Sequence, residues 1–363
     1  MDAVILVGGG GTRLRPLTYA LPKPLIPVFN QPLISRIIAH LARHGVDRVV
    51  LAAAASERRI EAALGDGAQL SVQLSYSYET EPLGSGLAVK QAAANFDGAF
   101  FVCNGDIITD LDLTAMLKQH RAQDATLSIA LSAVEDPTAF GIAELAGGDR
   151  ITRFVEKPSR EEAPSSWANA GTWIFEPEVL NHIPGQKLDG SLERLVFPKL
   201  IADGSVVQGF PADAYWIDVG TAERYLQLHR EVMQKRLAGW LPQGVEANAV
   251  CGEGCEVSPE AQLGANVILG RNARVGTRVR ITGPTVLGDN CAVGQGAKIA
   301  GSVLWSNIAI GAGAVVRDSI IGSGCSIGAN AILEGAVLGN GATVAPGVHL
   351  PPGARLEPDE VAA

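Results

Sequence analysis

The stretch VILGRNARVGTRVRITGPTVLGDNCAVGQGAKI, residues 267–299, decides the fold of the second half of this 363-residue chain. Within it and on both sides of it, an aliphatic residue returns every six positions, with occasional five-residue steps. A period of six fits neither an amphipathic helix nor an alternating strand. It fits a solenoid in which each unit forms one short flat side, points its aliphatic residue inward and turns a corner on small residues. The predicted inward residues are Val257, Leu263, Leu269, Val275, Ile281, Leu287, Val293, Ile299, Leu304, Ile310, Val316, Ile321, Ile327, Leu333, Leu338, Val344 and Leu350.

This repeat resembles that of the hexapeptide-repeat left-handed β-helices, which use three such units in each coil. The resemblance covers most of residues 250–350, and the segments LGAN, LGRN and IGAN are expected at the corners. We therefore predict a linker at 236–250, a left-handed parallel β-helix at 251–350 and a tail at 351–363.

The first part of the chain has a different pattern, in which strand-like apolar runs alternate with helical ones. AVILVG is followed by LISRIIAHLARHG, VDRVVLAAA, a helical stretch near residues 57–64 and AFFVCNGD. Such alternation predicts an α/β domain in which helices cover a parallel sheet. The fold class that we expect is Rossmann-like, with a mixed, mostly parallel sheet. We expect this domain to span residues 1–235 and to end in a helix within AERYLQLHREVMQKRLAG. Functional side chains should collect where its parallel strands end.

Composition narrows the classes of partner. A formal net charge of −9 argues against nucleic acid, which requires a broad basic surface. The opening residues MDAVILVGG carry no basic n-region, and no apolar run approaches the length of a membrane span, so a cytoplasmic protein without a membrane partner is expected. The five cysteines are an odd number in a long chain, and we expect no disulfide framework.

A glycine-rich stretch near the start, LVGGGGTRLRPLTYALPKPLIPV at residues 6–28, is the first candidate site. Four glycines, Gly8 to Gly11, are expected to form a turn between a strand and a helix, with backbone N–H groups close to phosphate oxygens. The loop is not a Walker loop, because no G-K-[ST] follows, and it does not match G-x-G-x-x-G, because Arg13 stands at the last glycine's place. The glycines alone leave a structural turn and a phosphate site equally open. Arg13 and Lys23 favour phosphate: the forked, permanently charged guanidinium of Arg13 suits the phosphates of a nucleotide, and the proline-framed Lys23 adds a second charge on a stiff backbone.

The sequence GGGGTRLRPLT followed by PKPLIPV resembles the signature of the sugar-nucleotide pyrophosphorylases, nucleotidyltransferases that join a sugar 1-phosphate to an NTP. Matching motifs follow in the family's order: YETEPLGSGLA, FVCNGDIITD, AFGIAEL, RFVEKPS, NAGTWIF and YWIDVGTAERY. The resemblance implies nucleotide binding by Gly8, Gly9, Gly10, Gly11, Thr12, Arg13, Glu81 and Gly86, and sugar-phosphate binding by Gly141, Glu156, Lys157, Asn169 and Gly171. It also implies catalytic roles for Arg13, Lys23 and Lys157, and a Mg²⁺ site at Asp106 and Asp218.

The implied reaction is in-line attack of a sugar-phosphate oxygen on the α-phosphorus of the NTP, with release of pyrophosphate. Two anions must meet, so positioning and charge neutralisation carry the catalysis. Carboxylates such as Asp106 and Asp218 are ligands that Mg²⁺ prefers, and the ion shares them with phosphates and water. Asp110, in ITDLDLTAMLKQH, is expected to cap the helix that follows.

The base is predicted from a single residue, Glu81. Guanine presents N1–H and N2–H₂ side by side, and a carboxylate accepts from both, so Glu81 favours GTP. The segments ETEPLGSG and SLERLVFPKL also resemble those of mannose-1-phosphate guanylyltransferases. Some uridylyltransferases of the family also carry glutamate at this place, so UTP or dTTP with a glucose-type sugar stays open.

We expect a homo-oligomer assembled through the β-helix, and two further roles for this domain stay open: binding of a regulator and acyl transfer. Acyl transfer requires a base, and His349, the only histidine beyond residue 229, is expected in a terminal turn. A non-catalytic regulatory protein of the same two-domain build is the rival from another class. Such a protein would be expected to lose the loop, Arg13 or the metal carboxylates, all of which are present here.

Overall fold

The computed structural model describes residues 1–185, 192–235, 237 and 240–363. The chain forms two compact units. The first comprises Met1–Gly9 and Ile34–Asp218, and the second comprises Gly10–Leu33 and Val219–Ala363. The residues predicted as one domain at 1–235 are thus shared between the units, because Gly10–Leu33 and helix α7 (Ala222–Lys235) pack with the β-helix. Residues 236, 238 and 239 of the predicted linker lie outside the described residues.

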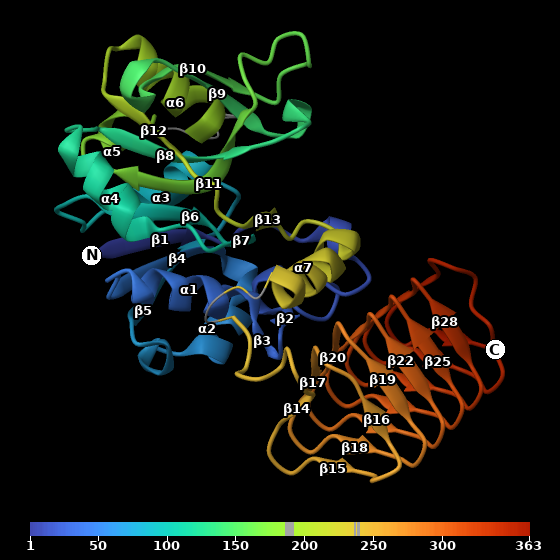
Figure 1. Cartoon of the computed structure of the whole chain (residues 1–363). Helices are drawn as coiled ribbons and strands as arrows, with labels where there is room; N and C mark the ends of the chain where they lie inside the picture. Colours follow the sequence, from blue (N-terminus) through green and yellow to red (C-terminus); the bar gives the residue numbers. More distant parts are fainter. Residues whose placement is uncertain (186–191, 236, 238–239) are drawn as a thin grey trace. The chain divides into compact units, whose positions relative to one another are not determined.

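The first unit is built on a nine-stranded mixed sheet (Figure 1). Its parallel part runs in the order β6, β1, β4 and β5, which follows the predicted βαβ alternation. Antiparallel strands extend the sheet beyond β6, and β12 pairs in parallel with β8. The predicted mixed, mostly parallel α/β fold is confirmed. The strands are β1 (Asp2–Leu6), β4 (Arg48–Ala54), β5 (Gln73–Glu79), β6 (Phe100–Asn104), β8 (Leu127–Ala133), β9 (Gly141–Leu145), β10 (Ile151–Glu156), β11 (Trp167–Phe175) and β12 (Val207–Pro211).

Helices pack against this sheet, and a cluster of aromatic side chains lies in its core. Trp173, Phe175 and Phe197 are fully buried and their rings contact one another. The segment SLERLVFPKL forms a π-helix (Leu192–Val196) and the start of α6, whereas its first residue, Ser191, lies outside the described residues. The helices of this part of the chain are α1 (Leu33–Arg43), α2 (Arg59–Leu64), α3 (Ser85–Ala92), α4 (Leu113–Ala122), α5 (Val179–His182) and α6 (Phe197–Ala202).

The second unit contains the predicted left-handed β-helix, whose short strands form three parallel sheets (Figure 1). We call them the first, second and third sheets. The first contains β14 (Val250–Cys251), β17 (Val267–Leu269), β20 (Thr285–Leu287), β23 (Val303–Leu304), β26 (Ile320–Ile321), β29 (Val337–Leu338) and β31 (Arg355–Leu356). The second contains β15 (Glu256–Val257), β18 (Arg274–Val275), β21 (Ala292–Val293), β24 (Ala309–Ile310), β27 (Ser326–Ile327), β30 (Thr343–Val344) and β32 (Val361–Ala362). The third contains β16 (Gln262–Leu263), β19 (Arg280–Thr282), β22 (Lys298–Ala300), β25 (Val315–Arg317) and β28 (Ile332–Glu334).

The predicted inward residues form the core of the β-helix. Leu269 pairs with Leu287, and Leu287 pairs with Leu304, so one coil takes 18 residues and the next takes 17. Of the predicted set, the residues from Leu269 to Val344 are all buried in one apolar cluster. Leu263 and Leu350 pack at its ends, partly buried. Val257 is the exception: it is 36% exposed, because it belongs to the outermost coil.

The corners form as the small-residue segments predict. Asn272 and Asn290 adopt left-handed backbone conformations, φ 55° and 58°, which asparagine tolerates better than most residues. The Asn272 side chain donates to Asn290 at 3.2 Å, and Asn290 donates to Asn307 at 3.0 Å, which links corners of successive coils. Gly270 is required by close stacking, since a Cβ there would lie 2.4 Å from the carbonyl carbon of Gly288.

The stretch predicted as a tail at 351–363 contributes strands instead. β31 pairs with β29 in the first sheet, and β32 pairs with β30 in the second. Pro351 and Pro352 interrupt the aliphatic pattern where the third sheet would continue, because proline cannot donate a ladder hydrogen bond. The chain crosses that side without a strand and then resumes the coil at Arg355.

Candidate active site

Two candidate segments of the first unit follow neighbouring parallel strands. β1 and β6 pair in parallel with Leu6 opposite Asn104, so Gly8 and Asp106 follow at the same edge of the sheet. Gly105 N donates to Leu6 O at 2.9 Å, and a Cβ on Gly105 would lie 2.6 Å from a methyl carbon of Val7. Glycine at 105 therefore allows the two strand ends to touch, which places Asp106 beside the start of the glycine loop.

One predicted metal ligand, Asp218, lies on a two-stranded ladder, and the other, Asp106, comes just before its partner strand. β13 (Trp216–Asp218) pairs antiparallel with β7 (Ile107–Thr109), with Asp218 opposite Ile107, the residue after Asp106. Both aspartates are partly buried. The structure thus places the backbones of two aspartates that are far apart in the sequence next to each other, and a metal site shared by them stays a prediction. The described residues contain no group of three or more His, Cys, Asp or Glu side chains able to hold a metal ion.

Asp110 corrects one expectation. Its carboxylate accepts from Tyr215 N at 2.7 Å, and its own N–H donates to Tyr215 O at 3.3 Å. Asp110 therefore ties the β7 end to the β13 start and supports the aspartate pair, and it does not cap a helix. The cap of α4 is Asp112, whose carboxylate accepts from Ala115 N at 2.9 Å. DLDLT offers two aspartates as possible caps, two residues apart, and the helix uses the second one.

The predicted sugar-phosphate residues come together at the paired strands β9 and β10. Gly141 pairs with Glu156, and a Cβ on Gly141 would lie 2.7 Å from a Glu156 carboxylate oxygen. Lys157 follows with a left-handed backbone, φ 51°, and its N–H donates to Phe140 O at 2.9 Å. Its ammonium group is 3.8 Å from Glu156, and its side chain is 57% exposed. A fixed backbone thus presents a solvent-accessible cation next to a half-buried carboxylate.

Asn169 and Gly171 lie next to this pair on β11. Ala168 pairs with Ile142, which puts Asn169 beside Gly141. The Asn169 side-chain oxygen accepts from Gly171 N at 3.0 Å and from the Trp173 indole N–H at 2.9 Å. That oxygen is engaged inside the protein, so the amide NH₂ is the group that Asn169 can offer a ligand.

The predicted base-reading loop joins β5 to α3. The Glu79 carboxylate at the end of β5 accepts from Leu83 N at 2.9 Å and so braces the turn that carries Glu81. Glu81 is exposed, and Gly86 is buried inside α3. A Cβ on Gly8 would lie 3.9 Å from Glu79 Oε1, so the glycine loop begins at this turn.

The remaining loop residues belong to the second unit. Gly11 has φ 59°, and a Cβ there would lie 3.1 Å from both Lys23 Cβ and Thr18 Cγ2. Thr18 Oγ1 donates to Gly11 O at 2.7 Å. These contacts place Lys23 beside the segment that carries Thr12 and Arg13. The exposed Gly10 precedes this turn.

The expected helix after the glycine loop is not formed. Thr12–Leu14 makes a 3-10 turn, and Lys23–Leu25 makes another between two prolines. Proline at positions 16, 22 and 24 prevents an α-helix over this segment. Any phosphate bound here would therefore meet loop N–H groups and side-chain cations, not a helix N-terminus. The placement of Arg13 and Lys23 relative to Asp106 and Lys157 stays a prediction.

Sequence reasoning missed Trp216. Its indole N–H donates to Ala170 O at 2.9 Å, and its ring meets that of Phe140 at 5.2 Å between centroids. It thus joins the strand of Asp218 to the residue between Asn169 and Gly171. The signal was present, since Trp216 stands two residues before Asp218 in the same motif.

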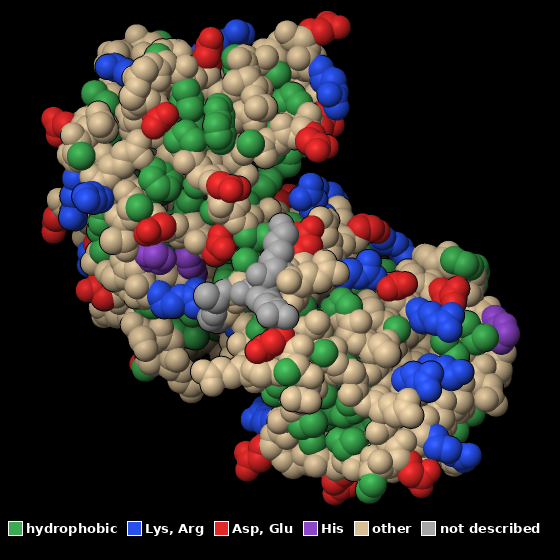
Figure 2. All heavy atoms as spheres, viewed as in Figure 1, with side chains coloured by type: hydrophobic (Ala, Val, Ile, Leu, Met, Phe, Trp, Pro, Cys, Tyr) green, Lys and Arg blue, Asp and Glu red, His purple; other side chains and the backbone are tan. Residues whose placement is uncertain are grey.

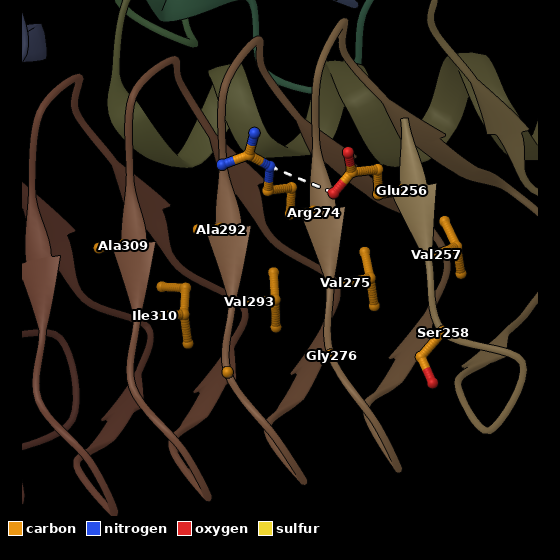
Figure 3. A pocket seen from close by; sticks show the side chains of 11 residues that line it. Glu256, Val257, Ser258, Arg274, Val275, Gly276, Ala292, Val293, Ala309 and Ile310 are labelled. Carbon is orange, nitrogen blue, oxygen red and sulfur yellow. Dashed lines mark ion pairs between the residues drawn. The ribbon is translucent and has the colours of Figure 1, made fainter. Parts of the chain in front are cut away.

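The β-helix carries a groove of about 610 Å³ along its second sheet (Figure 3). Val257, Val275, Val293 and Ile310 follow one another across four strands. Arg274 and Glu256 form an exposed ion pair of 3.4 Å beside them. The groove lining includes no histidine, so it lacks the base that acyl transfer would require.

Charged side chains of both signs are interspersed on the face shown in Figure 2. Among the described residues, no helix has the length and apolar character needed to cross a membrane.

Comparison with known proteins identifies the family. A family model described as nucleotidyl transferase matches residues 2–235, and one described as the EIF2B subunit epsilon LbH domain matches residues 246–350. The chain belongs to the nucleotidyl transferase family and carries a C-terminal left-handed β-helix. It is a sugar-1-phosphate nucleotidyltransferase, as its relatives are.

Two curated relatives show the range within the family. A mannose-1-phosphate guanylyltransferase of Mycobacterium tuberculosis is 36% identical over 72% of this chain and 73% of its own length. A UTP–glucose-1-phosphate uridylyltransferase of Synechocystis is 35% identical over 68% of this chain and 67% of its own. The solved structure of a putative glucose-1-phosphate thymidylyltransferase from Bacillus anthracis shares the fold, with a TM-score of 0.59 at 23% identity over 67% of this chain and 98% of that one.

Proposed function

We propose that this protein transfers a guanylyl group from GTP to mannose 1-phosphate, forming GDP-mannose and pyrophosphate. The observation that carries the proposal is the position of Glu81, an exposed carboxylate on a turn braced by Glu79. A carboxylate there accepts from both N1–H and N2–H₂ of guanine. The Mycobacterium tuberculosis relative is a mannose-1-phosphate guanylyltransferase, which supports the same pair of substrates.

In the proposed reaction, an oxygen of the sugar phosphate attacks the α-phosphorus of GTP. The bond from the α-phosphorus to the oxygen shared with the β-phosphorus breaks, and pyrophosphate leaves with that electron pair. Lys157 holds the incoming phosphate, and Arg13 and Lys23 neutralise the leaving pyrophosphate. Gly141 and Gly171 leave room for the sugar next to the backbone, Glu156 accepts from its hydroxyls, and Asn169 donates to them.

Asp106 and Asp218 fit a Mg²⁺ ion. Asp218 on β13 and Asp106, just before the facing strand β7, would supply hard oxygen ligands and leave the other positions to phosphate oxygens and water. When bound, the ion would neutralise charge on the reacting phosphates. Asp110 and Trp216 hold the strands that present the two carboxylates.

A second candidate is uridylyl or thymidylyl transfer to a glucose-type sugar 1-phosphate. The Synechocystis relative favours it, since its 35% identity to this chain is close to the 36% of the guanylyltransferase. The site chemistry would be unchanged, and only the contacts to the base and the sugar would differ.

The test is pyrophosphate release with Mg²⁺, measured for GTP, UTP, dTTP, ATP and CTP against mannose, glucose and N-acetylglucosamine 1-phosphates. We expect the highest kcat/KM for GTP with mannose 1-phosphate. A higher value for UTP or dTTP with glucose 1-phosphate would replace the first candidate with the second. No release with any pair would overturn both.

A further inference from the structure

The first sheet of the β-helix differs from the second in its outer face. Outward residues of the second sheet, such as Arg274, Ala292 and Ala309, are exposed. The corresponding residues of the first sheet are apolar and between 1% and 6% exposed: Ile268, Val286, Val303, Ile320 and Val337. Alternate residues of a strand face opposite sides, so these side chains point away from the β-helix core. The outer face of the first sheet is therefore a second buried surface.

Within the second unit, the β-helix makes hydrogen bonds and an ion pair with α7 and with the segment Gly10–Leu33. This segment carries Arg13 and Lys23. The Asn30 side chain donates to Leu287 O at 2.9 Å, from the end of that segment to the middle of the sheet. Arg230 of α7 pairs with Asp318 at 2.6 Å. His229 of α7 accepts from Phe29 N at 3.4 Å and contacts the Phe29 ring. The segment is thus held from the β-helix side directly and through α7.

Trp305 interrupts the repeat at the point where α7 meets the sheet. The residue after the inward aliphatic is glycine in other coils of the first sheet, at Gly270, Gly288, Gly322 and Gly339, whereas after Leu304 it is Trp305. Trp305 is 3% exposed, and its indole N–H donates to Tyr225 Oη at 3.1 Å. Burial raises the pKa of the Tyr225 phenol, so it stays a proton donor. It donates in turn to Pro27 O, four residues after Lys23.

Arg355 reaches the other end of the segment. It lies on β31 opposite Val337, in the row that is apolar in the other coils. One guanidinium nitrogen donates to Arg15 O at 2.9 Å, two residues after Arg13. The other donates to Glu223 of α7 at 2.9 Å. The planar fork of an arginine can bridge two such acceptors, whereas a lysine presents a point charge.

We propose that the β-helix is a positioning element of the nucleotidyl transfer site, with Arg355 and Trp305 as positioning residues for the segment that carries Arg13 and Lys23. The glycine run makes that segment costly to order, because glycine loses the most backbone freedom on becoming fixed. Contacts that fix the segment before the nucleotide arrives lower the cost of placing both cations. This inference rests on the proposed roles of Arg13 and Lys23.

The test compares full-length Arg355→Ala with Arg317→Ala as its matched control. Arg317 also makes an exposed ion pair on the β-helix, with Glu334 at 2.8 Å, but within the third sheet. We expect Arg355→Ala to lower kcat/KM for the NTP about tenfold, with less than a twofold change in KM for the sugar 1-phosphate, since a lost charged hydrogen bond has an effect of this order. Amide hydrogen exchange without substrates should become faster over residues 10–23 in Arg355→Ala and stay unchanged in Arg317→Ala.

A second variant, Trp305→Phe, keeps an aromatic ring in the buried site and removes the N–H that meets Tyr225, and it should show the same pattern around Lys23. Exchange over residues 10–23 and kinetics that match the Arg317→Ala control in both variants would overturn the proposal. The hydrogen-exchange measurement separates this result from a failure of the proposed function, because it needs no substrate. If no substrate pair were active in the wild type, faster exchange over residues 10–23 in Arg355→Ala would still support the positioning role of Arg355. Unchanged exchange would reject that role.

Discussion

Asp106 and Asp218 show at the scale of single residues how the fold makes a site. Each ends or follows a short strand, and the β7–β13 ladder sets one beside the other. Asp110 supports this ladder through two hydrogen bonds to Tyr215. The pair is thus held by backbone geometry, so changing either carboxylate should alter chemistry more than folding.

Asp106→Asn and Asp218→Asn should each lower Mg²⁺-dependent pyrophosphate release about a hundredfold or more, because a neutral amide is a poor ligand for Mg²⁺. The melting temperature should change little. Asp112→Asn is the matched control: it replaces an exposed aspartate of the same segment with another good helix cap. Activity in both site variants equal to that of Asp112→Asn would refute the metal assignment.

Glu81→Gln tests the choice of base. A glutamine accepts through one oxygen and presents an NH₂ where guanine also has donors, so we expect the GTP to UTP ratio of kcat/KM to fall about tenfold. Glu79→Gln is the control, since its remaining oxygen can still accept from Leu83 N. A ratio that stays at the wild-type value in Glu81→Gln would reject the guanine argument.

At the scale of elements, α1 contains a pH-sensitive group. His40 is 7% exposed, and burial is the main cause that lowers its pKa to about 4, with His44 and Arg43 acting in the same direction and Asp112 opposing them. The folded protein thus keeps His40 neutral at pH 5, whereas the unfolded chain protonates it below about 6.5. The contribution of His40 to the free energy of unfolding is therefore fully present above pH 6.5 and is lost as the pH drops toward 4.

The contribution of His40 to this fall between pH 7 and pH 5 should be about 2 kcal/mol. It can be measured by urea unfolding at both pH values. His40→Gln should remove most of that pH dependence, although it also alters packing at both pH values. His349→Gln, which changes an exposed histidine of the β-helix, is the control. If His40→Gln unfolds with the same pH dependence as the control, the assignment is wrong.

The elements also show which features the sequence could predict. A single buried aliphatic per short side is a strong constraint, and it identified the β-helix core from Leu269 to Val344. Two other features were predicted wrongly: an α-helix after the glycine loop, and Asp110 as the cap of α4. Both depend on the backbone conformation at one or two residues, which the sequence pattern does not determine. The hydrogen bonds of Trp305 and Arg355 depend on which outer face of the β-helix packs against other segments of the chain. No local sequence pattern encodes that choice. Trp305 was nevertheless visible as a break in the glycine positions of the repeat.

At the scale of the whole molecule, the end of the chain contributes both structure and a side chain toward the loop. β31 covers β29, and Leu356 is 7% exposed in the apolar core. Arg355 of the same strand bonds to Arg15 and Glu223. The residues predicted as a tail therefore complete the β-helix.

Ending the chain after Pro352 should lower kcat/KM for the NTP by about tenfold, as expected for Arg355→Ala, and should also lower the melting temperature, because the last coil loses its apolar cover. Ending it after Leu356 removes β32 but keeps β31 and Arg355, and it should keep most of the activity. Equal activity in the two truncated chains would contradict the role given to β31.

Homo-oligomerisation through the β-helix stays a prediction. Sedimentation of the full chain should give a mass above that of one chain. A monomer at the concentrations used for kinetics would refute it.

The most direct test of the whole account follows the oxygen atoms of the sugar phosphate. With the sugar 1-phosphate and NTP that give the highest kcat/KM, the sugar phosphate carries ¹⁸O in its phosphoryl oxygens, and products are analysed by mass spectrometry. Attack on the α-phosphorus predicts that all label is retained in the nucleotide sugar and none enters pyrophosphate. Label in pyrophosphate, or pyrophosphate release that does not require the sugar phosphate, would contradict nucleotidyl transfer at this site.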